Sequence, residues 1–274
     1  EITLDSIQGT EQKLNEVIVS SIRVKYNSPF THSNVSREDL SKKNLGQDLP
    51  ILLNYLPSVV TTSDAGAGIG YTGIRIRGIS AQSTNITING IPFNDAESHG
   101  TYWVNLPDFS SSIESLQVQR GVGTSTNGSG AFGSSINILT DGISDDPYAE
   151  ISNSFGSYDS RKHTVKFSSG LINDSFEISG RLSKIDSDGY VDRAFSDLKS
   201  YFLQGAYKRG NTFLKALAFG GHEKTYQAWD GLSKEQIKEN RRQNPLTYEN
   251  EIDNYKQDHY QIHLNQKIDS KWST

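Results

Sequence analysis

The chain has 274 residues, enough for one or two domains with substantial cores, and its 34% hydrophobic content excludes a disordered protein. It has no cysteine, which excludes disulfides, thiolate metal sites and a cysteine nucleophile. A net charge of −5 without clustered lysines and arginines argues against nucleic acid as a partner. Because glycine, tyrosine, serine, asparagine and threonine are abundant, we expect short strands and tight turns, hence a β-rich protein.

The N-terminal part is predicted to be an extended connection. Residues 1–13 look like the end of a preceding element and a polar linker. The next stretch, LNEVIVSS (14–21), is a short run of β-branched side chains beside polar residues. Such a run is either an ordinary edge strand or an exposed segment that adds itself to the sheet of a partner protein. The local pattern leaves both interpretations open.

Two short helices are predicted next. In SREDLSKKN, Ser36 is a suitable N-cap, with Asp39 at the third helical position. In QDLPILLNYLP, Pro50 lies near the start and Pro57 is a stop signal. The leucines of this second helix share one face, which we expect to be buried. They are Leu49, Leu52, Leu53 and Leu56.

A series of short alternating strands follows a glycine-rich loop at 61–73. The predicted strands cover residues 74–78, 84–93, 111–121 and 134–140. Between the last two lies GSGAFG (128–133), which fits the G-x-G-x-x-G pattern of dinucleotide-binding loops. That chemistry requires a helix after the glycines, but a strand-like SSINILT follows. The glycines therefore indicate a turn in which two backbones approach closely.

Past Pro147 the predicted strands are longer, about ten residues each. In 174–184, Phe176 and Ile178 fall on one face and Glu177 and Arg181 on the other. Short turns alternate with long loops, of which 222–258 is the longest. This pattern is typical of a transmembrane β-barrel, but a water-soluble antiparallel sandwich predicts the same alternation.

Several side chains are candidates for function. NDAESHGTYW places Asp95, Glu97 and His99 at alternate positions, which could hold a metal ion or serve acid–base chemistry. The interpretation we favour is a solvated loop that offers its acidic, histidine and aromatic side chains to a ligand. Arg75 and Arg77 share one face of IRIRG and need carboxylates or carbonyls as partners.

Four motifs occur in the order and at the spacing of a known family. They are IRIRG (74–78), INGIPF (88–93), IESLQVQRG (113–121) and NGSGAFGSSINI (127–138). Each is weak alone, but the ordered set resembles the plug domain and early barrel of the TonB-dependent outer-membrane transporters. Two positions depart from the family pattern. Gln117 stands where many members have an acidic residue, and Val122 where proline is common.

The resemblance implies the domain organisation. Residues 1–13 are similar to the end of a preceding β-domain, and 14–34 to the TonB box and its tether. Residues 35–141 are expected to form an α+β plug domain, a small mixed sheet with short helices. Residues 148–274 are expected to form the first antiparallel strands of a transmembrane β-barrel of about 22 strands. Because this length holds only about six such strands, we expect the chain to be an N-terminal fragment.

The resemblance also implies roles for three sets of residues. The first set pairs with the TonB energy transducer by strand addition and consists of Glu16, Val17, Ile18 and Val19. The second anchors the plug to acidic residues of the barrel and consists of Arg75, Arg77 and Arg120. The third contacts the solute and consists of Tyr71, Gln82, Glu97, His99, Tyr102 and Trp103.

The function implied is active transport of a scarce solute across the outer membrane. The solute is an iron chelate such as a siderophore, cobalamin or an oligosaccharide, and outer-membrane lipid surrounds the barrel. Some family members also work with a surface lipoprotein lid. We expect no catalytic residue, cofactor or metal. The alternatives are a secreted β-rich glycan-binding or adhesion module, and a glycosidase that uses Asp186, Asp188 or Asp192.

Overall fold

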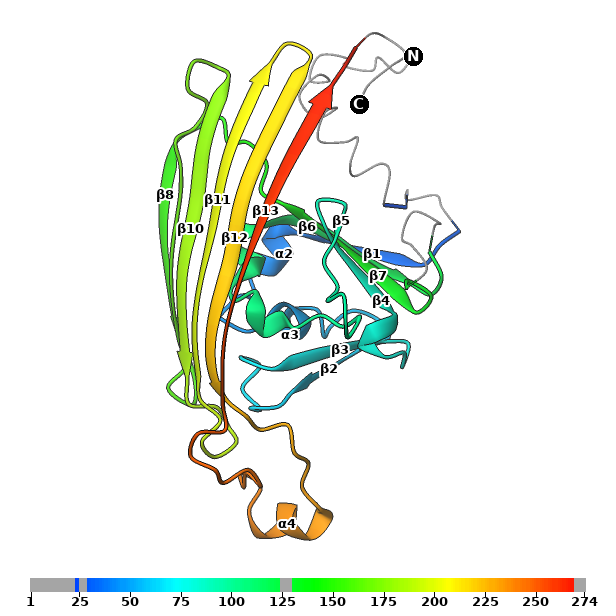
Figure 1. The fold of residues 1–274 in the computed structure, drawn as a ribbon, viewed down its shortest axis with the longest axis vertical. Helices are drawn as coiled ribbons and strands as arrows, with labels where there is room; N and C mark the ends of the chain where they lie inside the picture. Colours follow the sequence, from blue (N-terminus) through cyan, green and yellow to red (C-terminus); the bar gives the residue numbers. More distant parts are fainter. Residues whose placement is uncertain (1–22, 25–28, 124–129, 269–274) are drawn as a thin grey trace.

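The computed structural model describes residues 23–24, 29–123 and 130–268. The predicted TonB-pairing residues 16–19 lie outside this range. Figure 1 shows two units. Residues 29–123 and 130–141, here called the plug, pack against one face of a sheet formed by residues 148–266, here called the wall.

The plug contains a five-stranded mixed sheet in the order β1-β6-β7-β4-β5. Its strands are β1 (His32–Ser36), β4 (Thr84–Ile88), β5 (Ile91–Pro92), β6 (Ile113–Arg120) and β7 (Ser134–Thr140). Only β4 and β7 pair in parallel. A separate hairpin consists of β2 (Val59–Ser63) and β3 (Thr72–Ile76). The strands predicted from 74–78, 84–93, 111–121 and 134–140 are thereby confirmed.

The N-terminal edge of the plug begins earlier than residue 35. Strand β1 starts at His32 and pairs with β6. The backbone N–H of Val24 donates to the side-chain oxygen of Gln117 at 2.9 Å, and the Gln117 amide donates to Asn34 at 2.8 Å. An amide both donates and accepts, which a carboxylate cannot, so Gln117 is suited to hold this incoming segment.

Short helices occur where the sequence signals them. Helix α2 (Arg37–Ser41) has a capping box in which the Ser36 hydroxyl accepts from the backbone N–H of Asp39 at 3.2 Å. Helix α3 (Leu49–Leu52) is shorter than predicted, because bonds from residue i to i−3 continue the chain as turns. All four leucines of its face are still buried. Helix α4 is Lys234–Glu239, and no helix in the described part of the chain could cross a membrane.

Three single 3-10 turns complete the plug: η1 (Ala81–Ser83), η2 (Trp103–Asn105) and η3 (Phe109–Ser112). The end of GSGAFG leads directly into strand β7, as predicted. The Gly133 N–H donates to the Ser83 carbonyl at 3.0 Å, and a side chain at Gly133 would collide with Ile79. This glycine therefore serves close backbone packing.

The wall is an antiparallel sheet in which each strand pairs with its neighbour in the chain. Its strands are β8 (Tyr148–Phe155), β9 (Arg161–Ser168), β10 (Phe176–Ser187), β11 (Ser196–Arg209), β12 (Thr212–Tyr226) and β13 (Ile252–Gln266). The loop predicted at 222–258 was too long, since β12 and β13 stay paired up to Tyr226 and Ile252. Polar residues there keep the period-two alternation of a strand.

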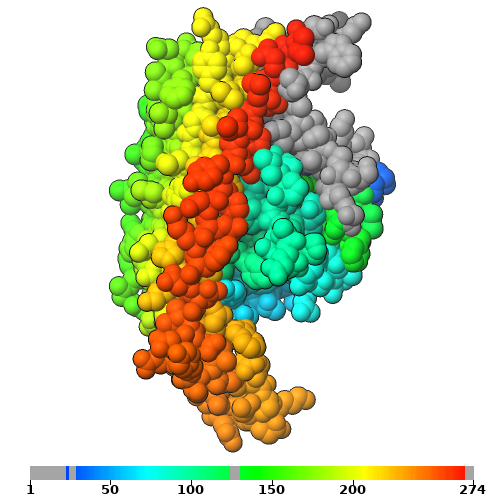
Figure 2. Space-filling model, in the orientation of Figure 1, coloured from blue at the N-terminus to red at the C-terminus, as the bar shows by residue number. Residues whose placement is uncertain are grey.

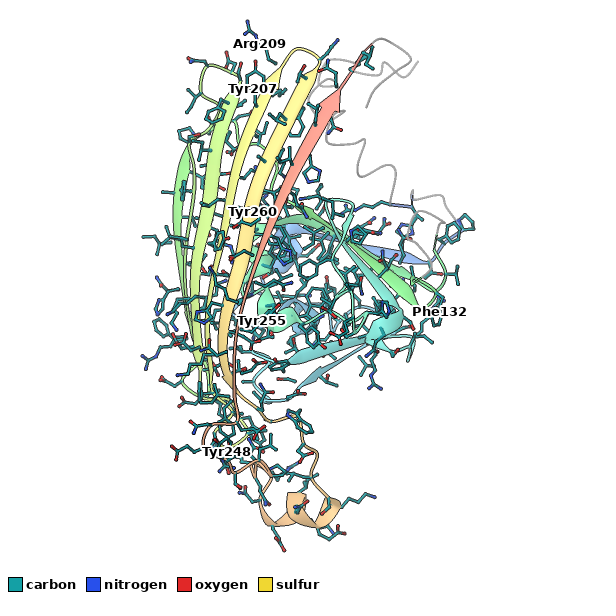
Figure 3. All side chains as sticks on the ribbon, in the orientation of Figure 1. Phe132, Tyr207, Arg209, Tyr248, Tyr255 and Tyr260 are labelled. Atoms are coloured by element: carbon teal, nitrogen blue, oxygen red, sulfur yellow. The ribbon has the colours of Figure 1, made fainter. Side chains whose placement is uncertain are left out.

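The faces of the wall are reversed relative to a soluble protein. Ile178, Leu182 and Ile262 are 47%, 57% and 76% exposed on the outer face, where Tyr260 also lies (Figure 3). Glu177 and Arg181 are buried beneath the plug. A water-soluble sandwich would bury its apolar face, so this alternative is wrong. An apolar outer band is typical of strands that face lipid.

The two ends of the wall differ. At one end, near Tyr207 and Arg209, β11 and β12 join through a tight turn (Figure 3). At the other end the loop 227–251, which carries α4 and Tyr248, projects beyond both the wall and the plug (Figure 2). We call these the short-turn end and the long-loop end.

Candidate functional site at the plug and wall interface

One hydrophobic core joins the plug to the wall. The Phe109 ring lies 5.2 Å from the ring of Phe219 and 6.4 Å from that of Phe202, centroid to centroid. Both partners belong to the wall, and all three are at most 3% exposed. Nearby, the Ser200 hydroxyl donates to the Pro107 carbonyl at 2.6 Å. The plug segment 103–112 is thus the docking segment.

Asp108, in this segment, is surrounded by polar side chains of the wall. Its carboxylate, which is 0% exposed, lies 3.0 Å from Lys162 and 3.3 Å from Arg181. The hydroxyls of Thr164 and Ser183 donate to it at 2.7 and 2.6 Å. Burial alone would raise the pKa of Asp108, but Arg181 and Lys162 hold the pKa below its ordinary value. Asp108 is therefore an ionised, fully paired carboxylate.

Asp141 repeats the arrangement farther along the interface. Its carboxylate is 2.7 Å from Arg37 of the plug and 2.6 Å from Lys166 of the wall. The buried ammonium of Lys215 donates to the Asp141 carbonyl at 2.7 Å. Across the interface the plug thus supplies the carboxylates and the wall supplies lysine and arginine, while Arg37 adds a cation from the plug itself.

The arginines expected to dock the plug lie elsewhere. Arg75 and Arg77 are exposed at β3. Arg120 donates to Ser33 at 2.7 Å and to the His32 carbonyl at 3.3 Å, both within the plug. None of the three forms an ion pair with a carboxylate in the described part of the chain. Their docking role remains a prediction about strands beyond this wall.

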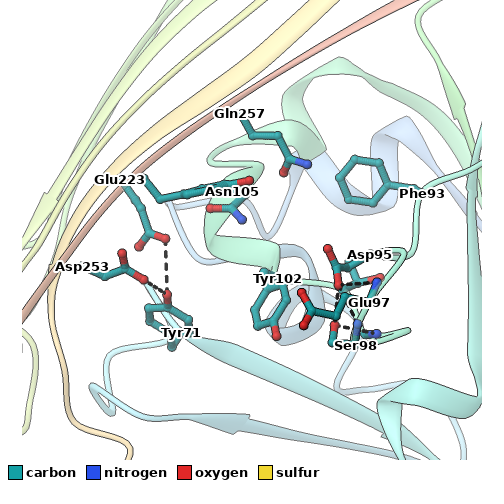
Figure 4. A pocket seen from close by; sticks show the side chains of 13 residues that line it. Tyr71, Phe93, Asp95, Glu97, Ser98, Tyr102, Asn105, Glu223, Asp253 and Gln257 are labelled. Carbon is teal, nitrogen blue, oxygen red and sulfur yellow. Dashed lines mark hydrogen bonds between the residues drawn. The ribbon is translucent and has the colours of Figure 1, made fainter.

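A pocket of about 640 Å³ opens between the plug and the long-loop ends of β12 and β13 (Figure 4). Its plug side comes from the loop between β5 and η2, together with Tyr71. The lining residues are Tyr71, Phe93, Asp95, Glu97, Ser98, Gly100, Thr101, Tyr102, Asn105, Glu223, Asp253, Tyr255 and Gln257. Its volume is in the range of small-molecule sites.

Tyr71 connects the plug to two wall carboxylates. Its hydroxyl lies 2.5 Å from the Asp253 carboxylate and 3.4 Å from that of Glu223. The Thr225 hydroxyl donates to the other Glu223 oxygen at 2.9 Å. Burial, followed by the bond to Asp253, raises the pKa of Tyr71. Tyr71 therefore remains a neutral donor.

The plug loop is shaped by its own acidic residue. The Asp95 carboxylate accepts from the backbone N–H groups of Glu97 at 3.1 Å and Ser98 at 2.7 Å. These bonds to Ser98 lower the pKa of Asp95. No three His, Asp or Glu side chains of the described residues are arranged to hold a metal ion. The bonds of Asp95 therefore indicate a structural role, which is to hold the backbone of this loop in its turn.

Asp48, a buried acid of the plug, contacts Thr72, the residue that follows Tyr71. One of its oxygens accepts from the Thr72 hydroxyl at 2.9 Å, and the Gly70 backbone N–H also lies close to the carboxylate. Burial raises the pKa of Asp48 to about 8, and the Glu223 carboxylate acts in the same direction. This acid is mostly protonated at neutral pH.

The residues predicted to contact solute separate into two groups. Tyr71, Glu97 and Tyr102 line the pocket together. The remaining three do not: Gln82 and His99 are exposed outside it, and Trp103 is 3% exposed in the plug core. Sequence reasoning missed the wall residues of the pocket. Their signal is a polar side chain on the inner face of a strand, close to a long loop.

Comparison with known proteins identifies the architecture. Residues 24–135 match the family model of the TonB-dependent receptor plug domain. The chain belongs to the TonB-dependent receptors. The receptor resides in the outer membrane of Gram-negative bacteria.

The receptor is similar to curated relatives over part of their length. It is 31% identical over 191 residues to the vitamin B12 transporter BtuB of Vibrio vulnificus, covering 69% of this chain and 29% of that protein. It is 28% identical over 186 residues to the probable TonB-dependent siderophore receptor PirA of Acinetobacter baumannii, covering 64% and 22%. The chain thus spans less than a third of the length of these relatives.

Solved structures share the fold. Pseudomonas aeruginosa FpvA, bound to a heterologous pyoverdine and iron, matches with a TM-score of 0.72 at 14% identity, covering 90% of this chain and 33% of that one. The ferric citrate transporter FecA in its unliganded form matches with a TM-score of 0.72 at 18% identity, covering 89% and 38%. These likenesses establish the plug and the first wall strands as the shared architecture.

Proposed function

We propose that the complete receptor actively takes up a scarce solute, powered by TonB. The observation that carries this proposal is the pocket of about 640 Å³ that plug and wall form jointly. A solute bound there touches two units that are held together by side-chain contacts and by a few backbone hydrogen bonds, such as those from Tyr190 and Val191 to the Ala65 carbonyl. Binding can therefore change the stability of the plug against the wall, and pulling on the plug can change the affinity for the solute.

The coupling to TonB is proposed to occur through residues 14–21. Glu16, Val17, Ile18 and Val19 would add a strand to the transducer, since main-chain hydrogen bonds give affinity in this mode. The relatives are named for vitamin B12 and siderophores. For this receptor, an iron chelate, cobalamin or an oligosaccharide is the proposed cargo, and a surface lipoprotein lid is a further proposed partner. The outward apolar face opposes the secreted glycan-binding alternative.

Deletion of residues 14–21 from the full-length receptor tests the proposal. The solute is first identified by native mass spectrometry of the receptor extracted from its own membrane. We then expect cellular uptake of the labelled solute to fall to background, while binding to the cell surface persists. Deletion of residues 4–11 in the preceding linker is the matched control and should leave uptake unchanged. Uptake that survives the 14–21 deletion, with normal receptor levels, would refute TonB coupling.

A further inference from the structure

We infer that the pocket selects a solute that presents a positively charged group, such as an amine, on an aromatic or similarly flat body. The inference rests on the proposed uptake function only in treating this pocket as the place where the solute binds. It adds the charge of the solute, which the family alone leaves open.

The first observation is an imbalance of charge. Four carboxylates line the pocket, from Asp95, Glu97, Glu223 and Asp253, and no lysine or arginine is among its lining residues. In the described part of the chain, none of these four forms an ion pair with lysine or arginine. Lys256 lies between two lining residues, but on the opposite face of β13, where it pairs with Asp258 at 3.1 Å.

The second observation is the way in which Glu223 and Asp253 meet. Glu223 is 1% exposed, yet its nearest compensation comes from neutral hydroxyls. Tyr71 has one proton, and at 2.5 Å that proton belongs to the bond with Asp253. Asp253 is therefore met by the Tyr71 hydroxyl and Glu223 by the Thr225 hydroxyl, and both donors are neutral. A cation placed between the two carboxylates would supply the charge that the protein does not.

The third observation concerns the rest of the lining. The side-chain oxygens of Thr101 and Asn105 are buried and have no hydrogen-bond partner. An ammonium group carries three N–H donors and no acceptor, so it can satisfy such oxygens. Four aromatic rings also line the pocket, and a cation over an aromatic face is attracted by it. They belong to Tyr71, Phe93, Tyr102 and Tyr255.

The same features disfavour an anion. A solute carboxylate in this pocket would face four protein carboxylates without a cation to offset the repulsion. The chemistry thus favours a solute whose exposed end is cationic over one whose exposed end is anionic.

Three probes of one shape test this inference: tyramine, tyrosol and 4-hydroxyphenylacetate. They share a hydroxyphenyl ring and end in an ammonium, a hydroxyl and a carboxylate. Calorimetry on the full-length receptor in detergent should give tyramine an affinity at least about tenfold above that of 4-hydroxyphenylacetate, with tyrosol between them.

Variants locate the effect in the pocket. Glu223→Gln and Asp253→Asn should each weaken tyramine about tenfold and leave tyrosol nearly unchanged. Glu97→Gln should weaken tyramine less and lies on an exposed loop, so it cannot fail through misfolding. Asp197→Asn is the matched control, because this carboxylate is on the wall outside the pocket and pairs with Lys184. It should change none of the affinities.

Equal affinity for the three probes, a preference for the carboxylate, or no binding of tyramine would each overturn the inference. The uptake test above is separate. A charge preference in a receptor whose uptake ignores residues 14–21 would refute the transport mechanism alone. Normal TonB-coupled uptake without any charge preference would refute the inference alone.

Discussion

Two sets of carboxylates lie at the same interface and have opposite surroundings. Asp108 and Asp141 each face two cations within 3.3 Å. Glu223 and Asp253 face the hydroxyl of Tyr71 and no cation among the described residues. A buried carboxylate is tolerated where cations and donors surround it, and it stays available to a ligand where they do not. Whether a carboxylate at this interface docks the plug or is left to bind a ligand therefore depends on the groups that face it and not on its being an aspartate or a glutamate.

The largest effect is expected for Asp108→Asn. The substitution leaves Lys162 and Arg181 buried without a carboxylate and should lower the free energy of unfolding by about 3–5 kcal/mol. Asparagine tolerates the left-handed φ of 51° at this position, so the change isolates the charge. Thermal unfolding of the full-length receptor measures the loss.

The control for this prediction is Asp159→Asn. Asp159 also has a left-handed φ, of 50°, but its pair with Arg161 is exposed. We expect a change of less than about 1 kcal/mol. If Asp108→Asn and Asp159→Asn lowered the free energy of unfolding equally, the buried ion pairs of Asp108 would contribute no more to stability than an exposed pair.

Phe109→Ala tests the apolar half of the docking contact. It removes the ring between Phe202 and Phe219 and should cost about 3 kcal/mol of unfolding free energy, through lost burial and a cavity. Phe132→Ala is the matched control, since Phe132 is 60% exposed on the plug surface and should cost little. Equal costs would mean that the plug does not depend on this core.

Asp48→Asn should change how stability depends on pH. The pKa of Asp48 is about 8 in the folded protein, whereas an unfolded aspartate titrates near about 4. Between these values the folded state holds a proton that the unfolded state has released. The contribution of Asp48 is therefore full below about pH 4 and is lost as the pH rises toward about 8.

Because asparagine does not titrate, the free energy of unfolding of the variant should rise by about 3–4 kcal/mol relative to that of the wild type between pH 5 and pH 8. Thermal unfolding across this range provides the measurement. Glu38→Gln, at an exposed position of α2, should keep the wild-type slope. If the stability of Asp48→Asn and that of the wild type changed with pH in parallel, the raised pKa of Asp48 would be contradicted.

The smallest effect on stability is expected for Tyr71→Phe. Asp253 loses its hydroxyl donor but borders an open pocket where water can replace it, so the cost should stay within about 1 kcal/mol. Tyr102→Phe, in the same pocket, is the control and should be neutral. A loss as large as that of Asp108→Asn would place the Tyr71 contact among the docking contacts and remove the contrast between the two sets.

Much of the fold could be predicted because its signals are local. The capping box at Ser36, the leucine face of α3 and the strand after GSGAFG each depend on residues within one or two turns of chain. The alternation in β10 was also correct, but it could not say which face is buried. That depends on whether lipid or water lies outside, which two-residue periodicity does not encode.

The candidate site was only partly predictable. Tyr71, Glu97 and Tyr102 stood in plug loops that the motifs single out, whereas Glu223 and Asp253 are ordinary polar positions on strands. Trp103 was predicted to contact the solute because it is an aromatic residue of the NDAESHGTYW loop, but the 3-10 turn η2 directs it into the core. A loop has no fixed side-chain period, so its sequence does not show which of its side chains point inward.

The sequence by itself determined the elements, their order and the family, since capping, alternation and glycine-dependent turns act over a few residues. Only the tertiary structure decided which carboxylates are paired and which are left to a ligand. Asp108 meets Arg181 across 73 residues of chain, and Tyr71 meets Asp253 across 182. Such pairs depend on how the plug settles against the wall, and this is set by the packing of Phe109 and its neighbours.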